Sequence, residues 1–233
     1  IELPKIEKKP ATVLSQEELE RLLATLSTHS YYPYILLCVT TGIRREELLG
    51  LCWDHVDFSK NTIKIEKTVV LAGSDLVLKN EGKTKGSHRT LQFPSFVSKM
   101  LLKEKEAATS EFLLPDSTGK MPVRPDVFSN TYRKLCKKAN ISHGGLHCLR
   151  HTYASILVSQ GIPLPLVQNA LGHSDLSMTM HYTHALPEQS QEVSNTMDTY
   201  FKNLIPASAS LVKERLSSTS FANCRKTAGK VIS

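Results

Sequence analysis

The amino-acid sequence predicts an α+β fold that is mainly helical and carries one small three-stranded antiparallel sheet. Apolar residues recur at helical spacing over most of the 233 residues. Between Asn61 and Phe93 the spacing changes to two, which is typical of strands. The composition, 40% hydrophobic and 22% charged, is that of a globular protein long enough to bury one large core or two small ones.

The helical segments begin and end at recognisable signals. Ser15 and Glu18 form a capping box, so the first helix is expected from Gln16 to Leu26. An apolar run from Tyr34 to Val39 stops at Thr40-Thr41-Gly42, and a new helix starts with Arg44 in its first turn. Further helices are expected at Phe96 to Ala107, at Val127 to Ala139, from about His147, and at Leu186 to Phe201.

Three short strands are expected, at Thr62 to Glu66, Leu76 to Leu78 and Thr90 to Phe93. The turn between the last two holds Lys83 and Lys85 between glycines, and His88 and Arg89 follow it. Such a turn usually carries only solvated charge. It could also contact a DNA backbone, or bring one lysine into a site as a general acid.

The domain organisation is predicted from where the patterns begin and end. Residues 1–10, which start at Ile1 and contain two prolines, are expected to be a linker from a missing N-terminal region. Residues 11–185 are expected to form one domain, 186–203 a C-terminal helix and 204–233 a weakly structured tail. The apolar stripe of the C-terminal helix could fold back on its own domain or dock on a neighbouring subunit; it comprises Leu186, Val193, Met197, Tyr200 and Phe201.

The charge balance favours a polyanionic partner. Twenty-nine Lys and Arg against 22 Asp and Glu give a net charge of +7, so a nucleic acid is favoured over an anionic membrane. No apolar run approaches the roughly 20 residues of a membrane span, and the N-terminus has no signal-peptide core. The five cysteines form no C-x-x-C pair, which is typical of reduced, packed thiols. A cytosolic location is therefore expected.

One cationic stripe is expected on the helix from Val127 to Ala139. Spacings of three and four place its basic residues on one face, where they suit phosphates along a duplex and carry no sequence information. A merely solvated face is the alternative. The residues are Arg133, Lys134, Lys137 and Lys138.

The segment from Gly144 to His184 holds the strongest candidate for an active site. His147 and Arg150 lie three residues apart on one helix and therefore share a face. An arginine binds a phosphate with two parallel donors, and a histidine exchanges a proton near neutral pH. Tyr182 is the nearby side chain that could attack phosphorus and hold it as an ester. Taken one at a time, these residues would be packing or surface residues; their combination suggests a site.

A zinc site is the competing interpretation of the same segment. His147 and His151 have the spacing of zinc-protease ligands, and His173 could be a third ligand. That motif needs a glutamate next to the first histidine as general base, and Cys148 occupies this position. The zinc interpretation is therefore disfavoured.

The motifs together resemble the catalytic domain of the tyrosine recombinases, the phage-integrase family, and look most like the integrases of conjugative transposons. The resemblance covers about Ala11 to Phe201. The matching motifs, all in the order of the family, are T-G-x-R at 41–44 with Glu47 following, the turn lysine in Gly82-Lys83-Thr84, H-x-x-R-H at 147–151, L-G-H at 171–173, and Tyr182 within His181-Tyr182-Thr183-His184.

This resemblance implies a role for each matching residue. Arg44 and Arg150 would clamp the scissile phosphate, and Lys83, with Lys85 two residues away as its rival, would protonate the leaving 5′ oxygen. His147 would transfer the proton of the tyrosine, His173 would hydrogen-bond the phosphate, and Tyr182 would form a 3′-phosphotyrosine. The backbone-contact candidates outside this set are Lys85, His88, Arg89, Arg133, Lys134, Lys137 and Lys138.

The implied activity is site-specific recombination for the integration and excision of a mobile element, in the bacterial cytosol and without metal or cofactor. Double-stranded DNA is the implied substrate, on which the protein would form a homo-oligomer, a tetramer in the synaptic complex, with accessory DNA-bending factors.

The family's core-binding and arm-binding domains are absent from this sequence, so weak DNA binding is expected. The alternatives to a recombinase are a type IB topoisomerase and a catalytically silent DNA-binding protein. Glu46 and Cys148 depart from the family pattern at positions expected to affect packing.

Overall fold

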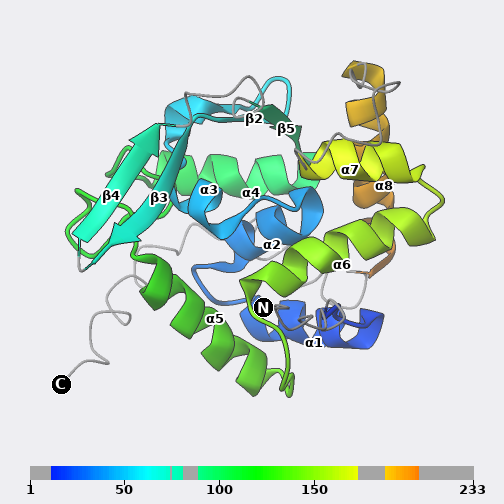
Figure 1. The fold of residues 1–233 in the computed structure, drawn as a ribbon, viewed down its shortest axis with the longest axis horizontal. Coiled ribbons are helices and arrows are strands. Elements are labelled where there is room, and N and C mark those ends of the chain that lie inside the picture. Colours follow the sequence, from blue (N-terminus) through cyan, green and yellow to red (C-terminus); the bar gives the residue numbers. More distant parts are fainter. Residues whose placement is uncertain (1–11, 74, 81–88, 173–186, 205–233) are drawn as a thin grey trace, which may run out of the picture.

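A computed structural model describes residues 12–73, 75–80, 89–172 and 187–204 (Figure 1). Its helices and strands, in chain order, are α1 (Gln16–Leu26), α2 (Tyr32–Thr41), α3 (Arg45–Leu49), the 3-10 helix η1 (Trp53–His55), β1 (Val56–Asp57), β2 (Thr62–Ile65), β3 (Lys67–Ala72), β4 (Asp75–Asn80), β5 (Arg89–Gln92), α4 (Ser95–Glu106), α5 (Pro125–Lys138), α6 (Leu146–Ser159), α7 (Leu164–Leu171) and α8 (Pro187–Leu204). The predicted α+β class is confirmed.

Helix α2 forms the centre of the fold. All of its residues, Tyr32–Thr41, are buried, because its sequence is apolar on every side and has no face suited to water. It contacts α3, α4, α6 and α8, which surround it in Figure 1. Gly42 ends α2 in the left-handed conformation, with φ of 63°, and a Cβ there would lie 2.6 Å from the ring of Tyr153 on α6. Only glycine therefore fits this turn.

The predicted capping box at the first helix is confirmed. The Ser15 hydroxyl accepts a hydrogen bond from the backbone N–H of Glu18, and the Glu18 carboxylate accepts one from the backbone N–H of Ser15. Helix α1 buries Leu19, Leu22 and two further leucines at the spacing expected of an amphipathic helix.

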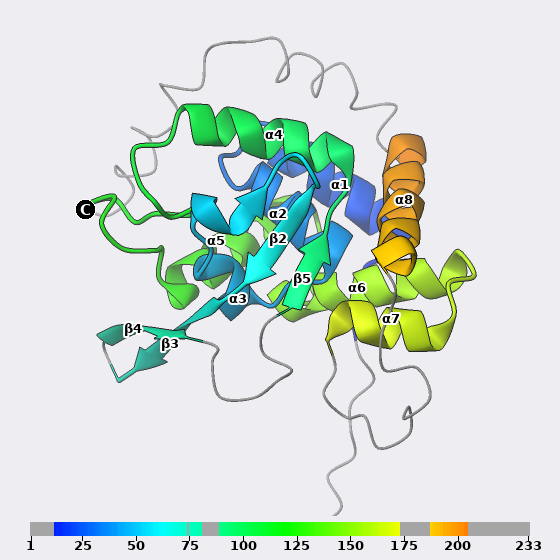
Figure 2. The ribbon, with the colours of Figure 1, turned by 90° about the horizontal axis from the view of Figure 1, so that it is seen from above.

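The strands pair differently from the prediction. The three-stranded antiparallel sheet exists, but its order is β1-β2-β5, so residues 56–57 supply the third strand. The expected strand at Leu76 to Leu78 belongs instead to β4, which pairs with β3 in a separate hairpin that projects from the body in Figure 2. After Ile65 the chain leaves the first sheet, and β3 passes directly against α3, where a Cβ on Gly50 would lie 2.5 Å from the Lys67 carbonyl oxygen.

Helix α8 packs on its own chain in this single-chain structure. Val193, Met197 and Phe201 are buried, and the helix contacts α2, α6, α7 and β5. The rings of Phe96 and Phe201 lie 6.0 Å apart between their centroids. The described part of the predicted apolar stripe is thus used within the chain, while docking on a second subunit stays a prediction. Leu186 lies outside the described residues.

Truncation of Met197 is expected to destabilise the domain. Its side chain has no exposed area, so Met197→Ala should leave a cavity between α8 and the core and lower the free energy of unfolding by about 2–5 kcal/mol. Urea denaturation measures this loss. Thr199→Ala is the matched control, because Thr199 is exposed on the same helix and should change the free energy by no more than about 0.5 kcal/mol. Equal stability of Met197→Ala and the parent would show that α8 does not pack on this core.

No helix within the described ranges combines the length and apolar character that crossing a membrane requires.

Candidate functional site

Half of the six predicted catalytic residues lie in the part of the chain that the structure describes. They are Arg44, at the start of α3, and His147 and Arg150, on α6. The predicted residues that lie outside the described ranges are Lys83, Lys85, His88, His173 and Tyr182.

Arg44 occupies the N-cap position of α3, in an extended conformation. Its backbone N–H and its Nη1 each donate to the carboxylate of Glu47, at 2.8 Å in both cases. Its Nη2 lies 3.5 Å from the carbonyl oxygen of Gly172, the residue that ends α7. The side chain is 38% exposed, so part of its guanidinium remains open to a ligand.

Glu47 is the anionic centre of the site. Its side chain is only 4% exposed, and its two oxygens accept from Arg44 and from both terminal nitrogens of Arg89, at 2.9 and 2.8 Å. Burial alone would raise the pKa of this carboxyl, but the charge of Arg89 and the hydrogen bonds from Arg44 hold the pKa below its usual value. Glu47 is therefore ionised at neutral pH.

Arg150 is buried at the meeting point of two helix ends. Its Nη1 donates to the carbonyl oxygen of Gly42, after α2, and its Nη2 donates to that of Leu171, the last residue of α7. Among the described residues no carboxylate forms an ion pair with it. Carbonyl groups at helix C-termini carry partial negative charge, so they stabilise the guanidinium without neutralising it.

The surroundings of Arg150 make its charge costly. Burial, followed by the charges of Arg44 and Arg89, lowers the pKa of Arg150 to about 10. The side chain stays charged at neutral pH, and a basic group whose pKa falls on folding reduces stability at every pH below that value. A buried cation kept at such a cost is more typical of a functional site than of a structural contact.

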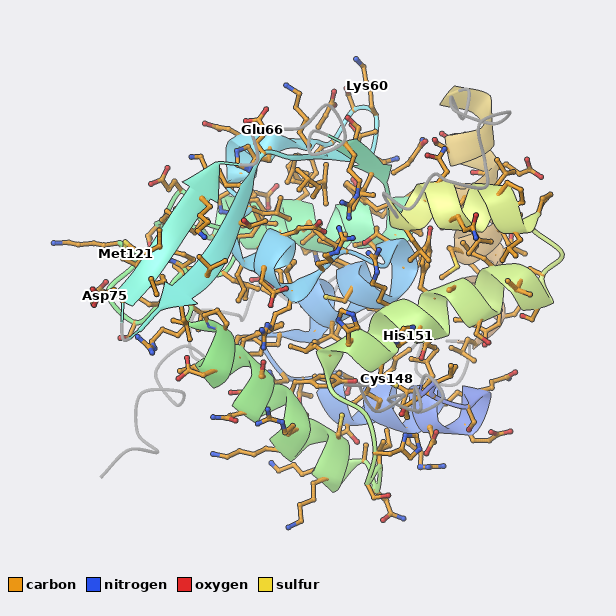
Figure 3. All side chains as sticks on the ribbon, viewed as in Figure 1. Lys60, Glu66, Asp75, Met121, Cys148 and His151 are labelled. Atoms are coloured by element: carbon orange, nitrogen blue, oxygen red, sulfur yellow. The ribbon has the colours of Figure 1, made fainter. Side chains whose placement is uncertain are left out.

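The two histidines of α6 stack edge to face. The ring centroids of His147 and His151 are 5.5 Å apart, and His147 is exposed at the start of the helix, whereas His151, labelled in Figure 3, is partly buried. Burial, then His147 and Arg150, lower the pKa of His151, so it is neutral at pH 7. His147 is thus the more exposed of the two α6 histidines.

The described residues contain no group of three side chains placed to bind a metal. The third ligand of the zinc interpretation, His173, lies outside these residues. Cys148 is buried, and its burial raises the pKa of the thiol. It is therefore a protonated packing residue, as expected.

The predicted backbone contacts fall into two groups. On α5, Tyr132, Leu135 and Cys136 are buried, and the opposite face carries the basic stripe. All four stripe residues are exposed: Arg133, Lys134, Lys137 and Lys138. Arg89 differs, because its side chain is only 15% exposed and both terminal nitrogens bind Glu47. To contact DNA as predicted, Arg89 would have to leave that pair.

Two guanidinium groups, those of Arg44 and Arg89, thus meet on the Glu47 carboxylate, and the buried guanidinium of Arg150 is close enough for its charge to interact with all three. These four side chains carry two positive charges in excess, held in place by helix ends and a buried anion. Such an arrangement suits an oxyanion such as a phosphodiester, because the donors are fixed before the ligand arrives.

Sequence reasoning missed part of this arrangement. Glu47 was noted only as part of a motif, although its spacing of three from Arg44 on one helix was a usable signal. No local signal identified Arg89 as its second partner, because 42 residues separate the two. Gly42 and Gly172 were noted as a helix stop and a motif residue, and their role as carbonyl acceptors depends on the fold.

Comparisons with known proteins identify the family of this chain. The model of the phage integrase family matches residues 12–189. A XerC-like tyrosine recombinase from Caldanaerobacter subterraneus subsp. tengcongensis is 30% identical over 84% of this chain and 56% of its own length. The integrase of Salmonella phage P22 is 27% identical over 88% of this chain and 52% of its own. The chain spans little more than half the length of these relatives.

A solved structure supports the same fold. The Tn1549 transposon integrase, in complex with a circular intermediate DNA, matches 81% of this chain and 66% of its own, with a TM-score of 0.66 and 21% sequence identity. The family resemblance predicted from the motifs is therefore confirmed. Since the family model covers three quarters of the sequence, including Arg44, His147, Arg150 and Tyr182, the chain belongs to the phage integrase family.

Proposed function

We propose that this chain is the catalytic part of a site-specific DNA recombinase that cleaves and rejoins strands through a 3′-phosphotyrosine, for the integration and excision of a mobile element. The observation that carries the proposal is the pairing of Arg44 and Arg89 with Glu47 beside the buried charge of Arg150, which leaves an excess of positive charge. A phosphodiester in transfer concentrates negative charge, which preorganised guanidinium groups stabilise.

The proposed reaction is a transesterification with one bond formed and one broken. The Tyr182 oxygen attacks the scissile phosphorus, and the bond from phosphorus to the 5′ oxygen breaks. His147 takes the tyrosine proton, which suits its exposed position at the start of α6. Lys83 gives a proton to the leaving 5′ oxygen, with Lys85 as the rival for this role. The ester preserves the energy of the broken bond, so a second 5′ hydroxyl reseals the strand without ATP.

The two arginines differ in how they would bind the phosphate. Both terminal nitrogens of Arg150 donate hydrogen bonds to the carbonyl oxygens of Gly42 and Leu171. Arg150 would therefore stabilise a phosphate chiefly through its fixed positive charge, and through any N–H group that these two bonds do not use. Arg44 is more exposed, and its Nη2 has only a long contact to Gly172, so this nitrogen is the better placed direct donor. His173, one residue beyond Gly172, is proposed to hydrogen-bond the same phosphate.

The proposed partner is double-stranded DNA, held along its backbone by the exposed basic stripe on α5 and by the segment with Lys85 and His88. The Tn1549 transposon integrase complex with DNA supports this partner. On DNA the protein is proposed to assemble as a homo-oligomer, a tetramer in the synaptic complex, with α8 able to dock on a neighbour and with accessory DNA-bending factors. The place of action is the bacterial cytosol.

Covalent capture on DNA tests this function without knowledge of the target sequence. The probe is a library of DNA duplexes with a randomised sequence around a nick. The nick is placed so that cleavage releases a short oligonucleotide, and the loss of this oligonucleotide prevents religation. Protein at high concentration should form adducts that survive denaturation and enrich one sequence class. Absence of any adduct would favour a catalytically silent DNA-binding protein. Relaxation of supercoiled plasmid by monomers, without pairing of two sites, would favour a type IB topoisomerase.

Metal removal separates this mechanism from a zinc hydrolase. If arginines supply the electrostatic stabilisation, the yield of adduct should be unchanged in excess EDTA, and the purified protein should contain no stoichiometric zinc by elemental analysis. Loss of adduct on chelation, with recovery on adding Zn²⁺, would contradict the proposal.

A further inference from the structure

We propose that Arg89 is a positioning residue that keeps Arg44 available for the scissile phosphate by taking up half of the hydrogen-bonding capacity of the Glu47 carboxylate. This inference rests on the proposed function and assigns to Arg89 a role different from the backbone contact expected from the sequence. It draws on three features of the structure: the saturation of Glu47, the charge balance of the cluster, and the contact between Arg89 and Gly172.

Glu47 is fully occupied by hydrogen bonds. Oε1 accepts from Arg44 Nη1 at 2.8 Å and from Arg89 Nη1 at 2.9 Å. Oε2 accepts from the backbone N–H of Arg44 and from Arg89 Nη2, each at 2.8 Å. A carboxylate has about four lone-pair sites, so Arg89 uses half of them. Arg44 is left with a single side-chain bond to Glu47, which leaves the rest of its guanidinium available.

Removing Arg89 would change this balance. A buried carboxylate with two vacant sites is strongly disfavoured, and the nearest remaining cation is Arg44. Its guanidinium could then turn to bind Glu47 with two parallel hydrogen bonds, the geometry that arginine and carboxylate prefer. Arg44 would be neutralised and drawn away from the direction of Gly172. Arg89 therefore prevents Glu47 from capturing the catalytic arginine.

Arg89 is held in place from two sides. It begins β5, and its backbone is paired with Ile65 of β2. On the other side a Cβ on Gly172 would lie 2.9 Å from both Cδ and Nε of Arg89. The absence of a side chain at Gly172 thus gives the guanidinium its space, and the carbonyl oxygen of the same glycine faces Arg44 Nη2. One arginine consequently links β5, the carboxylate and the turn after α7.

A double-mutant cycle on DNA cleavage tests this role. The variants are Arg89→Met, Glu47→Gln and the double variant, assayed for the rate of adduct formation at saturating protein on the sequence recovered by covalent capture. Arg89→Met should slow cleavage about 100-fold in the Glu47 background, because a misdirected reactive group costs about that much. In the Glu47→Gln background the same change should cost less than about threefold, since the neutral amide no longer competes for Arg44.

Binding and conservative substitution complete the test. The DNA affinity of Arg89→Met, measured at fixed salt, should stay within about twofold of the parent, whereas a backbone contact would weaken it and reduce its salt dependence. Arg89→Lys should recover part of the rate, because it keeps the charge facing Glu47 but not the paired donors. Circular dichroism checks folding, and if Arg89→Met does not fold, the cycle is run with Arg89→Lys.

Two results would overturn the inference. One is an equal loss of rate from Arg89→Met in both backgrounds, which would mean that Arg89 acts independently of Glu47. The other is a loss of DNA affinity with an unchanged rate at saturation, which would make Arg89 the backbone contact predicted from the sequence. Either result can be obtained only if the parent protein forms the covalent adduct with DNA. If the parent forms no adduct, the proposed function is refuted instead.

Discussion

The Tyr182→Phe variant is expected to form no covalent adduct with DNA while keeping its DNA affinity. The substitution removes only the attacking oxygen, so a loss of at least about 10⁴-fold in adduct yield is expected, with the detection limit of the assay as the bound. Denaturing electrophoresis of the protein with the nicked substrate measures the yield, and gel-shift titration measures the affinity.

Tyr200→Phe is the matched control, because this tyrosine lies on α8 and burial raises the pKa of its hydroxyl. Its adduct yield should equal that of the parent. Tyr153, which also belongs to the motif-rich segment, is buried against Gly42, and burial raises the pKa of its hydroxyl, so it cannot supply an attacking oxygen. Peptide mapping of the adduct to Tyr153 or Tyr200, or an adduct that survives in Tyr182→Phe, would refute the assignment of the nucleophile.

The Arg150→Lys variant is expected to slow cleavage by about 10²-fold or more, although the charge is conserved. Arg150 reaches the carbonyl oxygens of Gly42 and Leu171 at the same time, with two nitrogens in one plane. A lysine presents a single ammonium group on a flexible stem, so it cannot hold both helix ends and keep its charge at the same point. Single-turnover kinetics at saturating protein measure the effect on the chemical step.

Arg21→Lys is the matched control for the same exchange. Arg21 Nε also donates to a carbonyl at a helix end, that of Ala139 after α5, at 3.2 Å, but it belongs to α1 and takes no part in the cluster around Glu47. Its cleavage rate should be unchanged. If both arginine variants lost activity equally, the defect would reflect helix packing in general. If Arg150→Lys kept the parent rate, Arg150 would supply charge alone.

The sequence by itself determined most of the helices and the residue types available for chemistry, but not β1, β3 or α7. The capping box of Ser15 and Glu18 placed the first helix correctly, and Gly42 marked the end of α2. These signals could be read directly because they act through hydrogen bonds between residues two to four positions apart. The motifs that contain Arg44, His147, Arg150 and Tyr182, in their order along the chain, identified the family, which the family model confirms.

The tertiary structure alone decided which partners these residues meet. Leu76 to Leu78 had the correct period for a strand, but period two does not specify a neighbour, and in the fold this segment pairs with β3 rather than with β2 or β5. Arg89 was predicted to contact the DNA backbone, because its charge is visible in the sequence and its burial is not. Its partner Glu47 is 42 residues away, and the carbonyl of Gly42 that receives Arg150 is 108 residues away. Contacts at such separations depend on how the whole core closes, because closing a long loop becomes favourable only when many packed side chains compensate for the lost chain entropy.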